Sequence, residues 1–311
     1  MLVKLQELKT KRRCEYCLKP LQKVRRMNSN STTSDTGASS PDGGWQACLE
    51  LEISQRHEKS VVSDSRQKGP LTIQSPFYPE NEVCHLYLLH PPAGIVGGDR
   101  LNFTIVAKDK GSALVTTPGA TKFYTSNGKL AYQEQSFTIA DGASLEWLPQ
   151  ETIYFPDANA HLRTTVHLSG SAQFLGWDIH CLGLPANNKD FGGGQARVIL
   201  SIYRDGRPLL LESIRISSDK KRFQAAFLQN QPVFGSFVTT GGTVELLESL
   251  RERMSATDNG LWAATLVEGL LIVRYLGAST SEARKIFIES WKVLRPLVLG
   301  RDVVLPRIWA T

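Results

Sequence analysis

Residues 101–109 read LNFTIVAKD, and this stretch decides the fold class. Its apolar side chains fall at every second position, namely Leu101, Phe103, Ile105 and Ala107. Polar residues occupy Asn102, Thr104 and Lys108 between them. Successive side chains of a strand point to opposite faces of a sheet, so this alternation predicts a strand with one buried face.

Similar extended runs lie on both sides of this strand, from about Trp45 to Thr240. They include SALVTT, LAYQEQ, SFTIA, ASLEWL, TIYF, LRTTVHL, AQFLGWDIHCL, ARVILSIY and LLLESIRI. The pair Asp205-Gly206 separates two of them and predicts a hairpin. Many short strands with a turn every ten or so residues indicate stacked or coiled, β-helix-like sheets, with antiparallel neighbours expected.

The period changes after residue 242. Residues 243–254 and 260–276 have helical patterns, and a third helix begins with a capping box formed by Ser279 and Glu282. That helix carries one apolar stripe, formed by Ala283, Ile286, Phe287, Trp291 and Leu294. The stripe is expected to pack on the core or, alternatively, to dock a partner, and Pro296 is expected to end the helix. The fold class is therefore mainly β with a smaller helical C-terminal segment.

Charge and composition divide the chain at about residue 44. Residues 1–26 hold nine Lys and Arg against two Glu, which leaves 27 basic and 28 acidic residues in the rest of the chain. Residues 28–44 are rich in Ser, Thr, Gly and Asn. We expect residues 1–44 to be a basic, disordered extension, with Met27 as a possible true start, and residues 45–311 to be one domain. The rest of the chain has no excess of basic residues of the kind that indicates nucleic-acid binding.

The cellular setting follows from what the sequence lacks. No apolar run has the length of a signal peptide or of a membrane span. Five scattered cysteines suit a reducing compartment, and Cys14-x-x-Cys17 is only half of a zinc ribbon. We therefore expect a cytoplasmic protein that acts without a membrane.

Common catalytic and phosphate-binding motifs are absent, so single residues carry the search for a site. Asp178 and His180 share one face of a strand about 7 Å apart, which suits either a hydrogen-bonded strand face or a transient metal contact. Glu146 lies in LEWLPQE on a strand that looks enclosed, and a buried carboxylate needs partners or a raised pKa. Asp99 follows a Gly-Gly pair and is either a turn residue or a presented carboxylate.

Four segments, in this order, resemble the UreD (UreH) family of urease accessory proteins: HPPAGIVGGDRL (90–101), TTPGATKFYTS (116–126), LEWLPQETIYF (145–155) and PRIW (306–309). The resemblance covers roughly residues 45–311. It implies a non-enzymatic maturation factor with a largely β fold and helices toward the C-terminus. It further implies that the protein binds apo-urease, recruits a UreF-like protein and through it a UreG-like GTPase, and helps lysine carbamylation and nickel insertion.

The resemblance also implies an internal polar passage for nickel, with no tightly bound cofactor. A carrier must release its ion, and scattered carboxylates hold Ni²⁺ more weakly than a closed Cys/His set. The candidate stations are Asp99, Glu146, Asp178, His180 and Asp190. Asp190 stands where relatives commonly have Glu, which places its role in question.

Two other functions remain open on the residues alone. A hydrolase could pair Asp99 with Glu146 or Glu151, as glycosidases pair two carboxyl groups. The other function that remains open is the binding of a sugar or a protein by a β-rich module. Co-purification with apo-urease or turnover of a glycoside would separate these functions.

Overall fold

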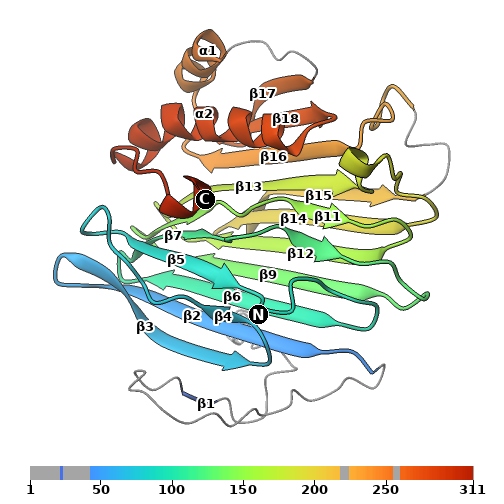
Figure 1. The fold of residues 1–311 in the computed structure, drawn as a ribbon. Helices are drawn as coiled ribbons and strands as arrows, with labels where there is room; N and C mark the ends of the chain where they lie inside the picture. The colour runs from blue at the N-terminus through green and yellow to red at the C-terminus, as the bar shows by residue number, and fades with distance from the viewer. Residues whose placement is uncertain (1–21, 24–42, 218–223, 255–259, 311) are drawn as a thin grey trace, which may run out of the picture.

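Two β-sheets face each other across an apolar core, and one helix covers the outer side of one sheet (Figure 1). The computed structural model describes residues 22–23, 43–217, 224–254 and 260–310. Of the predicted extension before residue 43, only Gln22–Lys23 falls within this part, as β1 paired with β3. The remainder of that extension, Cys14 and Cys17 included, lies outside the described residues.

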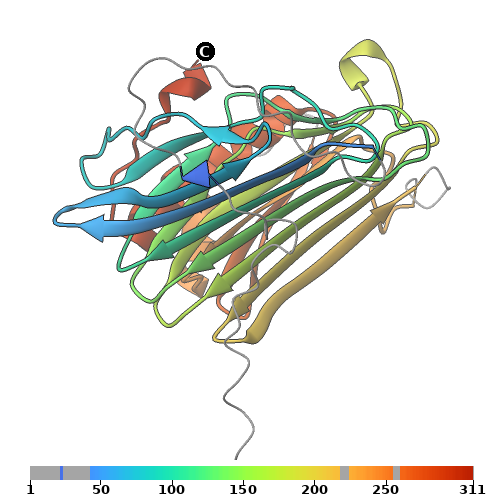
Figure 2. The same cartoon turned by 90° about the horizontal axis from the view of Figure 1, so that it is seen from below.

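The first sheet has eight strands in the order β1-β3-β2-β6-β9-β12-β14-β15. Their bounds are β1 Gln22–Lys23, β3 Lys59–Lys68, β2 Gln46–Arg56, β6 Arg100–Lys108, β9 Ala131–Ile139, β12 Asn159–Leu168, β14 Gln195–Arg204 and β15 Arg207–Ile216. Figure 2 shows these strands side by side, from blue β2 to gold β15.

The second sheet has ten strands, eight of them in the order β17-β18-β16-β13-β10-β7-β5-β4. Their bounds are β17 Leu261–Val267, β18 Leu270–Gly277, β16 Val233–Thr240, β13 Gln173–Leu182, β10 Ser144–Trp147, β7 Ser112–Thr116, β5 Cys84–Leu89 and β4 Thr72–Ile73. The other two, β11 (Thr152–Tyr154) and β8 (Thr121–Phe123), pair with each other, and β11 also pairs with β13.

The chain coils between the sheets, which confirms the stacked, β-helix-like prediction. From β5 to β14 the long strands alternate between the second and the first sheet, so each returns beside its predecessor in the same direction. The pairs β2–β6, β6–β9, β9–β12 and β12–β14 are therefore parallel. The expectation of antiparallel neighbours was wrong for this central part, because each return passes through the opposite sheet. The hairpin at Asp205-Gly206 is confirmed, with positive φ at both residues.

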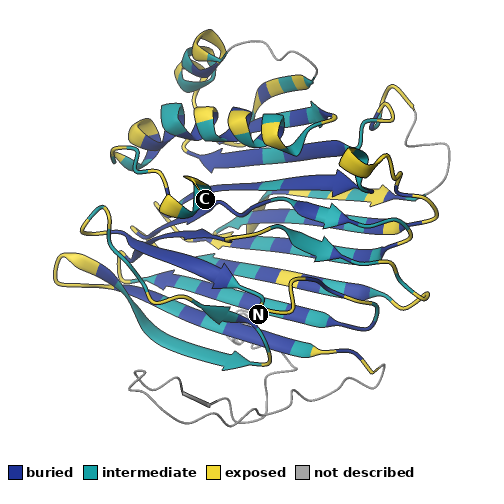
Figure 3. Ribbon diagram, in the orientation of Figure 1, coloured by how far each residue is buried: buried dark blue, intermediate teal, exposed yellow. Residues whose placement is uncertain are grey.

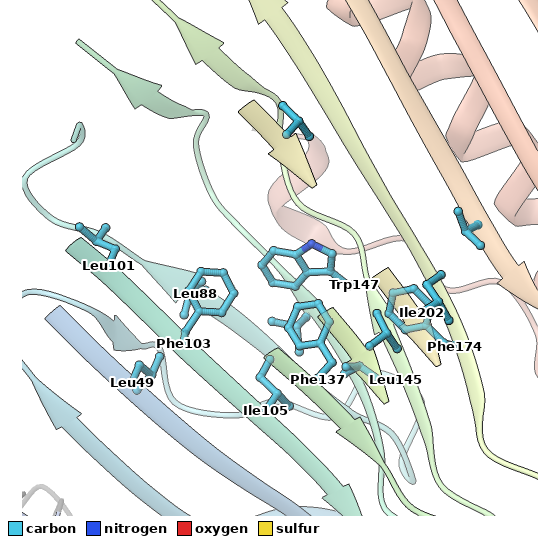
Figure 4. Packing of buried hydrophobic residues seen from close by; sticks show 14 of the residues in the cluster. Leu49, Leu88, Leu101, Phe103, Ile105, Phe137, Leu145, Trp147, Phe174 and Ile202 are labelled. Atoms are coloured by element: carbon cyan, nitrogen blue, oxygen red, sulfur yellow. The ribbon is translucent and has the colours of Figure 1, made fainter. Parts of the chain in front are cut away.

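The predicted alternation along residues 101–109 is confirmed. Every second residue of β6 is buried, and Figure 3 shows the same banding along the neighbouring strands. The inward side chains build an aromatic centre in which the ring of Trp147 lies 5.4 Å from that of Phe103 and 5.2 Å from that of Phe137 (Figure 4). This core holds the two sheets together through apolar burial.

The helix predicted over residues 260–276 was wrong, because this segment is the hairpin β17–β18. Glu268 and Gly269 both have positive φ, the backbone of a tight hairpin turn. Strand β18 lies between β17 and β16, and its residues Leu270–Val273 are all buried. A strand buried on both faces gives a continuous apolar run rather than an alternation, and such a run is easily read as helical.

The other two predicted helices are confirmed as α1 (Val244–Arg253) and α2 (Thr280–Leu299). The side chain of Ser279 caps α2 by accepting the backbone N–H of Glu282 at 3.2 Å. The whole predicted stripe of α2 is buried against the second sheet, so the stripe packs on the core. Pro296 does not end α2; the helix continues to Leu299, and Gly300 ends it with φ 64°.

Candidate functional site

A cavity of ≈ 450 Å³ lies between the two sheets. Its polar lining comes from strands and loops of both sheets: His90, Thr117, Thr121, Lys122, Gln133, Gln135, Gln150, Thr152 and Asp178. Residues 91, 93, 118 and 119 also line it and are exposed, so the cavity opens to solvent between two loops. A cavity of this size suits a small ligand or a chain of waters.

Asp178 and His180 stand on the cavity side of β13, as their spacing predicts. Asp178 and the neighbouring Ser236 of β16 line an internal space, whereas Trp177, Ile179 and Cys181 belong to the cluster beneath α2. The Thr164 hydroxyl donates to the Asp178 carboxylate at 3.3 Å. The Tyr154 hydroxyl lies 3.2 Å from Nδ1 of His180, within hydrogen-bond distance.

Burial shifts the protonation of both groups toward their neutral forms. It raises the pKa of the Asp178 carboxyl from 3.8 to about 7. The polar hydrogens of Trp147 and Thr164 act in the opposite direction, although only the Thr164 hydroxyl meets hydrogen-bond geometry. Burial lowers the pKa of the His180 imidazole to about 3. Near pH 7 burial therefore keeps the imidazole neutral and favours the protonated carboxyl, and both groups have lone pairs for a metal ion.

Two deeply buried polar atoms of the cavity wall have no partner within hydrogen-bond distance in the described part of the chain. They are Oε1 of Gln135 and Nε1 of Trp147, and both residues are 2 % exposed. Because buried polar groups are ordinarily hydrogen-bonded, this wall is built to meet water or a polar ligand.

Glu146 lies on the opposite face of the same sheet, under α2. It is 1 % exposed, as the sequence predicted, and accepts bonds from Nε1 of Trp291 at 2.7 Å and from Nε of Arg295 at 3.0 Å. Arg295 also bonds Glu80 at 2.6 Å, and Glu80 lies 2.6 Å from Nε2 of His85. Burial opposes the charge of Glu80, but the bonds from His85 and Arg295 outweigh it and keep the pKa of Glu80 below its ordinary value.

Asp99 is buried in the turn that follows the Gly-Gly pair. One carboxylate oxygen accepts the backbone N–H of Trp45 at 2.7 Å, and the other accepts that of Val96 at 2.9 Å. A Cβ at Gly44 would lie 2.2 Å from the carbonyl carbon of Gly98, so the two segments need glycine to approach this closely. These contacts are those of a turn residue; the predicted role of Asp99 as a nickel station stays a prediction.

The remaining candidates lie apart from the cavity. Asp190 is exposed in the loop after the short 3₁₀ helix η2 (Pro185–Asn187). Glu151 pairs with Arg284 of α2 at 2.8 Å. Asp99, Glu146 and Glu151 thus have separate partners, which gives no support to a pair of hydrolytic carboxyl groups. The described residues contain no group of three or more His, Cys, Asp or Glu that could hold a metal ion.

The structure adds site residues that the sequence did not indicate. His90 lines the cavity, and its pKa is lowered by burial while the Asp99 carboxylate acts in the opposite direction. Thr164 and Gln135 come from the first sheet and reach the site across the core. The signal for His90 was its even spacing from Leu86 and Leu88, which continues their face of β5 one residue beyond the end of the strand.

Three of the four segments that carry the family resemblance meet at this cavity. The first segment contributes His90, Pro91 and Ala93, and the second contributes residues 117–122. The third contributes Trp147, Pro149, Gln150 and Thr152. The fourth, in the 3₁₀ helix η4 (Arg307–Ala310), supports the wall from behind, because Nε1 of Trp309 donates to the Thr116 hydroxyl at 3.2 Å. Segments far apart in the chain therefore build one site.

The fold and site define a two-sheet β protein with an open polar cavity and, among its described residues, no closed metal set. The family model described as UreD urease accessory protein matches residues 46–310. The chain belongs to the UreD family of urease accessory proteins, which act in urease maturation.

Curated relatives agree. The protein of Alcanivorax borkumensis is 42 % identical over 86 % of this chain and 93 % of its own length. That of Enterobacter sp. is 43 % identical over 86 % and 96 %, and that of Klebsiella aerogenes 42 % over 86 % and 97 %. Each bears the name urease accessory protein UreD. Among the described residues, no helix is both long and apolar enough to span a membrane.

Proposed function

We propose that this protein is a scaffold for urease maturation that passes Ni²⁺ through its internal cavity toward apo-urease. The observation that carries the proposal is the convergence of three family segments on one open cavity with a polar lining. The family places the protein in urease maturation, and the cavity is the route that we propose for the ion.

The chemistry of the lining suits transit better than storage. Along the cavity an ion would meet the His90 imidazole, the Gln133 and Gln135 amides, and then Asp178 with His180. Amide and water oxygens bind Ni²⁺ weakly, and a single carboxylate with a neutral imidazole binds it moderately. Within its described residues the protein thus offers successive weak ligands and no group of three or more metal-ligating side chains that would retain the ion.

Asp178 and His180 are the stations we favour among the predicted residues. At Glu146 the ion would have to displace Arg295 and Trp291, and at Asp99 it would have to break two bonds to backbone amides. Both displacements leave buried groups without partners, which costs more than a weakly bound ion returns.

The partners we propose are apo-urease, a UreF-like protein and, through it, a UreG-like GTPase, with assembly in the cytoplasm. Cys84 and Cys181 are free thiols buried in the core, which fits the reducing compartment that we propose.

The test is co-expression of the full chain with urease and its other accessory proteins. Asp178→Asn should lower the nickel content per purified urease severalfold while the accessory complex still assembles. The matched control is Glu134→Gln, the same loss of charge on the exposed face of β9. Unchanged nickel content in the Asp178 variant would refute the passage.

Asp99→Ala separates the two roles of that residue in the same assay. Loss of the accessory complex would identify Asp99 as the turn residue that its bonds to Trp45 and Val96 describe. Loss of nickel with the complex intact would instead place Asp99 on the path.

A further inference from the structure

A second, smaller chamber of ≈ 40 Å³ adjoins the main cavity. Trp147 and Asp178 line both spaces, so Asp178 stands at their junction. A chamber of this size holds about two or three waters. Beyond Asp178 its polar lining comprises Thr164, His180, Glu212 and Ser236.

One wall of the chamber is a polar row on the ten-stranded sheet. In the strand register Asp178 of β13 lies beside Ser236 of β16, and Ser236 lies beside Arg274 of β18. Neighbouring strands lie about 4.8 Å apart, so two steps carry this row about 10 Å from the junction toward the edge of the sheet. All three residues are partly exposed, although most of their neighbours are buried.

A second row faces it from the eight-stranded sheet. Thr164 of β12 lies beside Leu200 of β14, and Leu200 lies beside Glu212 of β15. The two rows touch at both ends: Thr164 donates to Asp178 inside, and Arg274 donates to Glu212 outside. The chamber occupies the space between these two contacts.

The outer contact lies where both sheets end. Strand β15 is the last of its sheet, and β18 is separated from the edge of the other sheet only by β17. The side chains of Arg274 and Glu212 are 42 % and 24 % exposed. A second ion pair, Arg207 with Glu268, joins the same two hairpins farther along and is more exposed. Side-chain ion pairs of this kind are weak and can open.

We propose that the passage has a second mouth at the edge between β15 and β18, and that the Glu212–Arg274 ion pair closes this mouth to cations. The proposal rests on the proposed function for its cargo, Ni²⁺, but its geometry stands without it. Arg274 neutralises Glu212 while the mouth is closed; once it swings away, Glu212 is a carboxylate at the rim, one chamber away from Asp178. The passage thereby gains an exit distinct from the opening at residues 91–93 and 118–119.

The mouth can be tested on the isolated full chain with Ag⁺ as a small cationic probe. Asp178→Cys, in a chain with Cys14→Ser and Cys17→Ser, places a thiol at the junction. The probe replaces the thiol proton, forming an S–Ag bond and releasing H⁺ to the buffer. After timed exposure, unreacted thiol is alkylated in denaturant and counted by mass spectrometry, with the chain lacking Asp178→Cys as the baseline for the buried native cysteines.

Removing the ion pair should open the mouth. Arg274→Ala and, separately, Glu212→Gln should speed the silver reaction about two- to fivefold, the size expected for a partly exposed pair. The exchanged pair Glu212→Arg with Arg274→Glu should restore the slow rate. The matched control is Arg215→Ala, the loss of a positive charge on an exposed residue of the same strand β15. Equal rates in all variants, or equal acceleration by Arg215→Ala, would overturn the proposal.

The silver reaction is measured on the isolated chain, so its result does not depend on urease. A faster reaction in Arg274→Ala beside an unchanged nickel content in Asp178→Asn would establish the mouth and refute nickel as its cargo. An unaltered silver rate beside a lowered nickel content would refute the mouth and leave the passage intact.

Discussion

On the α2 side of the ten-stranded sheet, Glu146 is held by Trp291 and Arg295, and Arg295 is held in turn by Glu80 and the backbone carbonyl of Asp302. On the cavity side of the same sheet, Asp178 accepts one bond from the described residues, the 3.3 Å bond from Thr164. Glu146 is 1 % exposed, whereas Asp178 is partly exposed to the cavity. The Glu146 carboxylate accepts hydrogen bonds from Trp291 and Arg295, whereas the Asp178 carboxylate faces the cavity.

This difference separates a structural charge from a functional one. The buried, fully bonded ion pair of Glu146 and Arg295 fixes the position of α2. Removing either partner leaves an uncompensated buried charge and strongly lowers the stability of the fold. A carboxylate beside unpartnered polar atoms keeps binding capacity for a ligand or water, at a cost in folding stability. The predictions below test whether the two faces differ as their bonds indicate.

The largest effect is expected on the α2 side. Arg295→Met leaves Glu146 and Glu80 buried without their cation and should lower the free energy of unfolding by about 3–5 kcal/mol. Denaturant unfolding of the purified chain measures this loss. Adding Glu146→Gln should recover part of it, because one uncompensated charge is then gone.

The control for Arg295→Met lies on the same helix. Lys292 pairs with Glu289 on the solvent side, where the two side chains are 36 % and 48 % exposed. Lys292→Met should change the free energy of unfolding by less than about 0.5 kcal/mol. A loss for Arg295→Met no greater than that of the control would contradict the structural role of the network.

On the cavity side, removing the charge of Asp178 is expected to raise the free energy of unfolding rather than to lower it. The folded pKa of Asp178 is about 7 against 3.8 ordinarily, so between these values the folded chain binds more protons than the unfolded chain. The contribution of Asp178 to stability therefore falls as pH rises from about 4 to 7 and stays low above 7. Asp178→Asn mimics the neutral form and should be more stable than the parent above pH 7, by about 1–3 kcal/mol after allowance for water in the cavity.

The measurement is the difference in unfolding free energy between variant and parent at pH 4 and pH 8. Groups common to both proteins cancel in this difference, including His180, whose depressed pKa makes stability rise with pH between about 3 and 6.5. The difference should be near zero at pH 4 and favour the variant at pH 8. Glu134→Gln on the exposed face of β9 should show no such dependence. A variant less stable than the parent at pH 8 would mean that Asp178 has structural partners like those of Glu146.

The sequence predicts this contrast only in part, because its signals are local. The alternation of β6 and the shared face of Asp178 and His180 follow from the period of a strand and are confirmed. The parallel pairing and the hairpin at residues 261–277 were missed, since pairing through another sheet and burial on both faces leave no local alternation. The enclosure of Glu146 was predicted, but its partner Arg295 is 149 residues away. No spacing rule links positions so far apart.

The smallest expected effect refines the α2 side itself. Arg284 of α2 pairs with Glu151 at 2.8 Å, but the two side chains are 28 % and 15 % exposed, and Nε of Arg284 has no partner among the described residues. The pair lies on the same face as Arg295 and differs from it in solvent access and in the number of bonds. Arg284→Met should therefore cost at most about 1 kcal/mol in denaturant unfolding. A loss as large as that of Arg295→Met would show that the position under α2, rather than burial and complete bonding, determines how much these ion pairs contribute to stability.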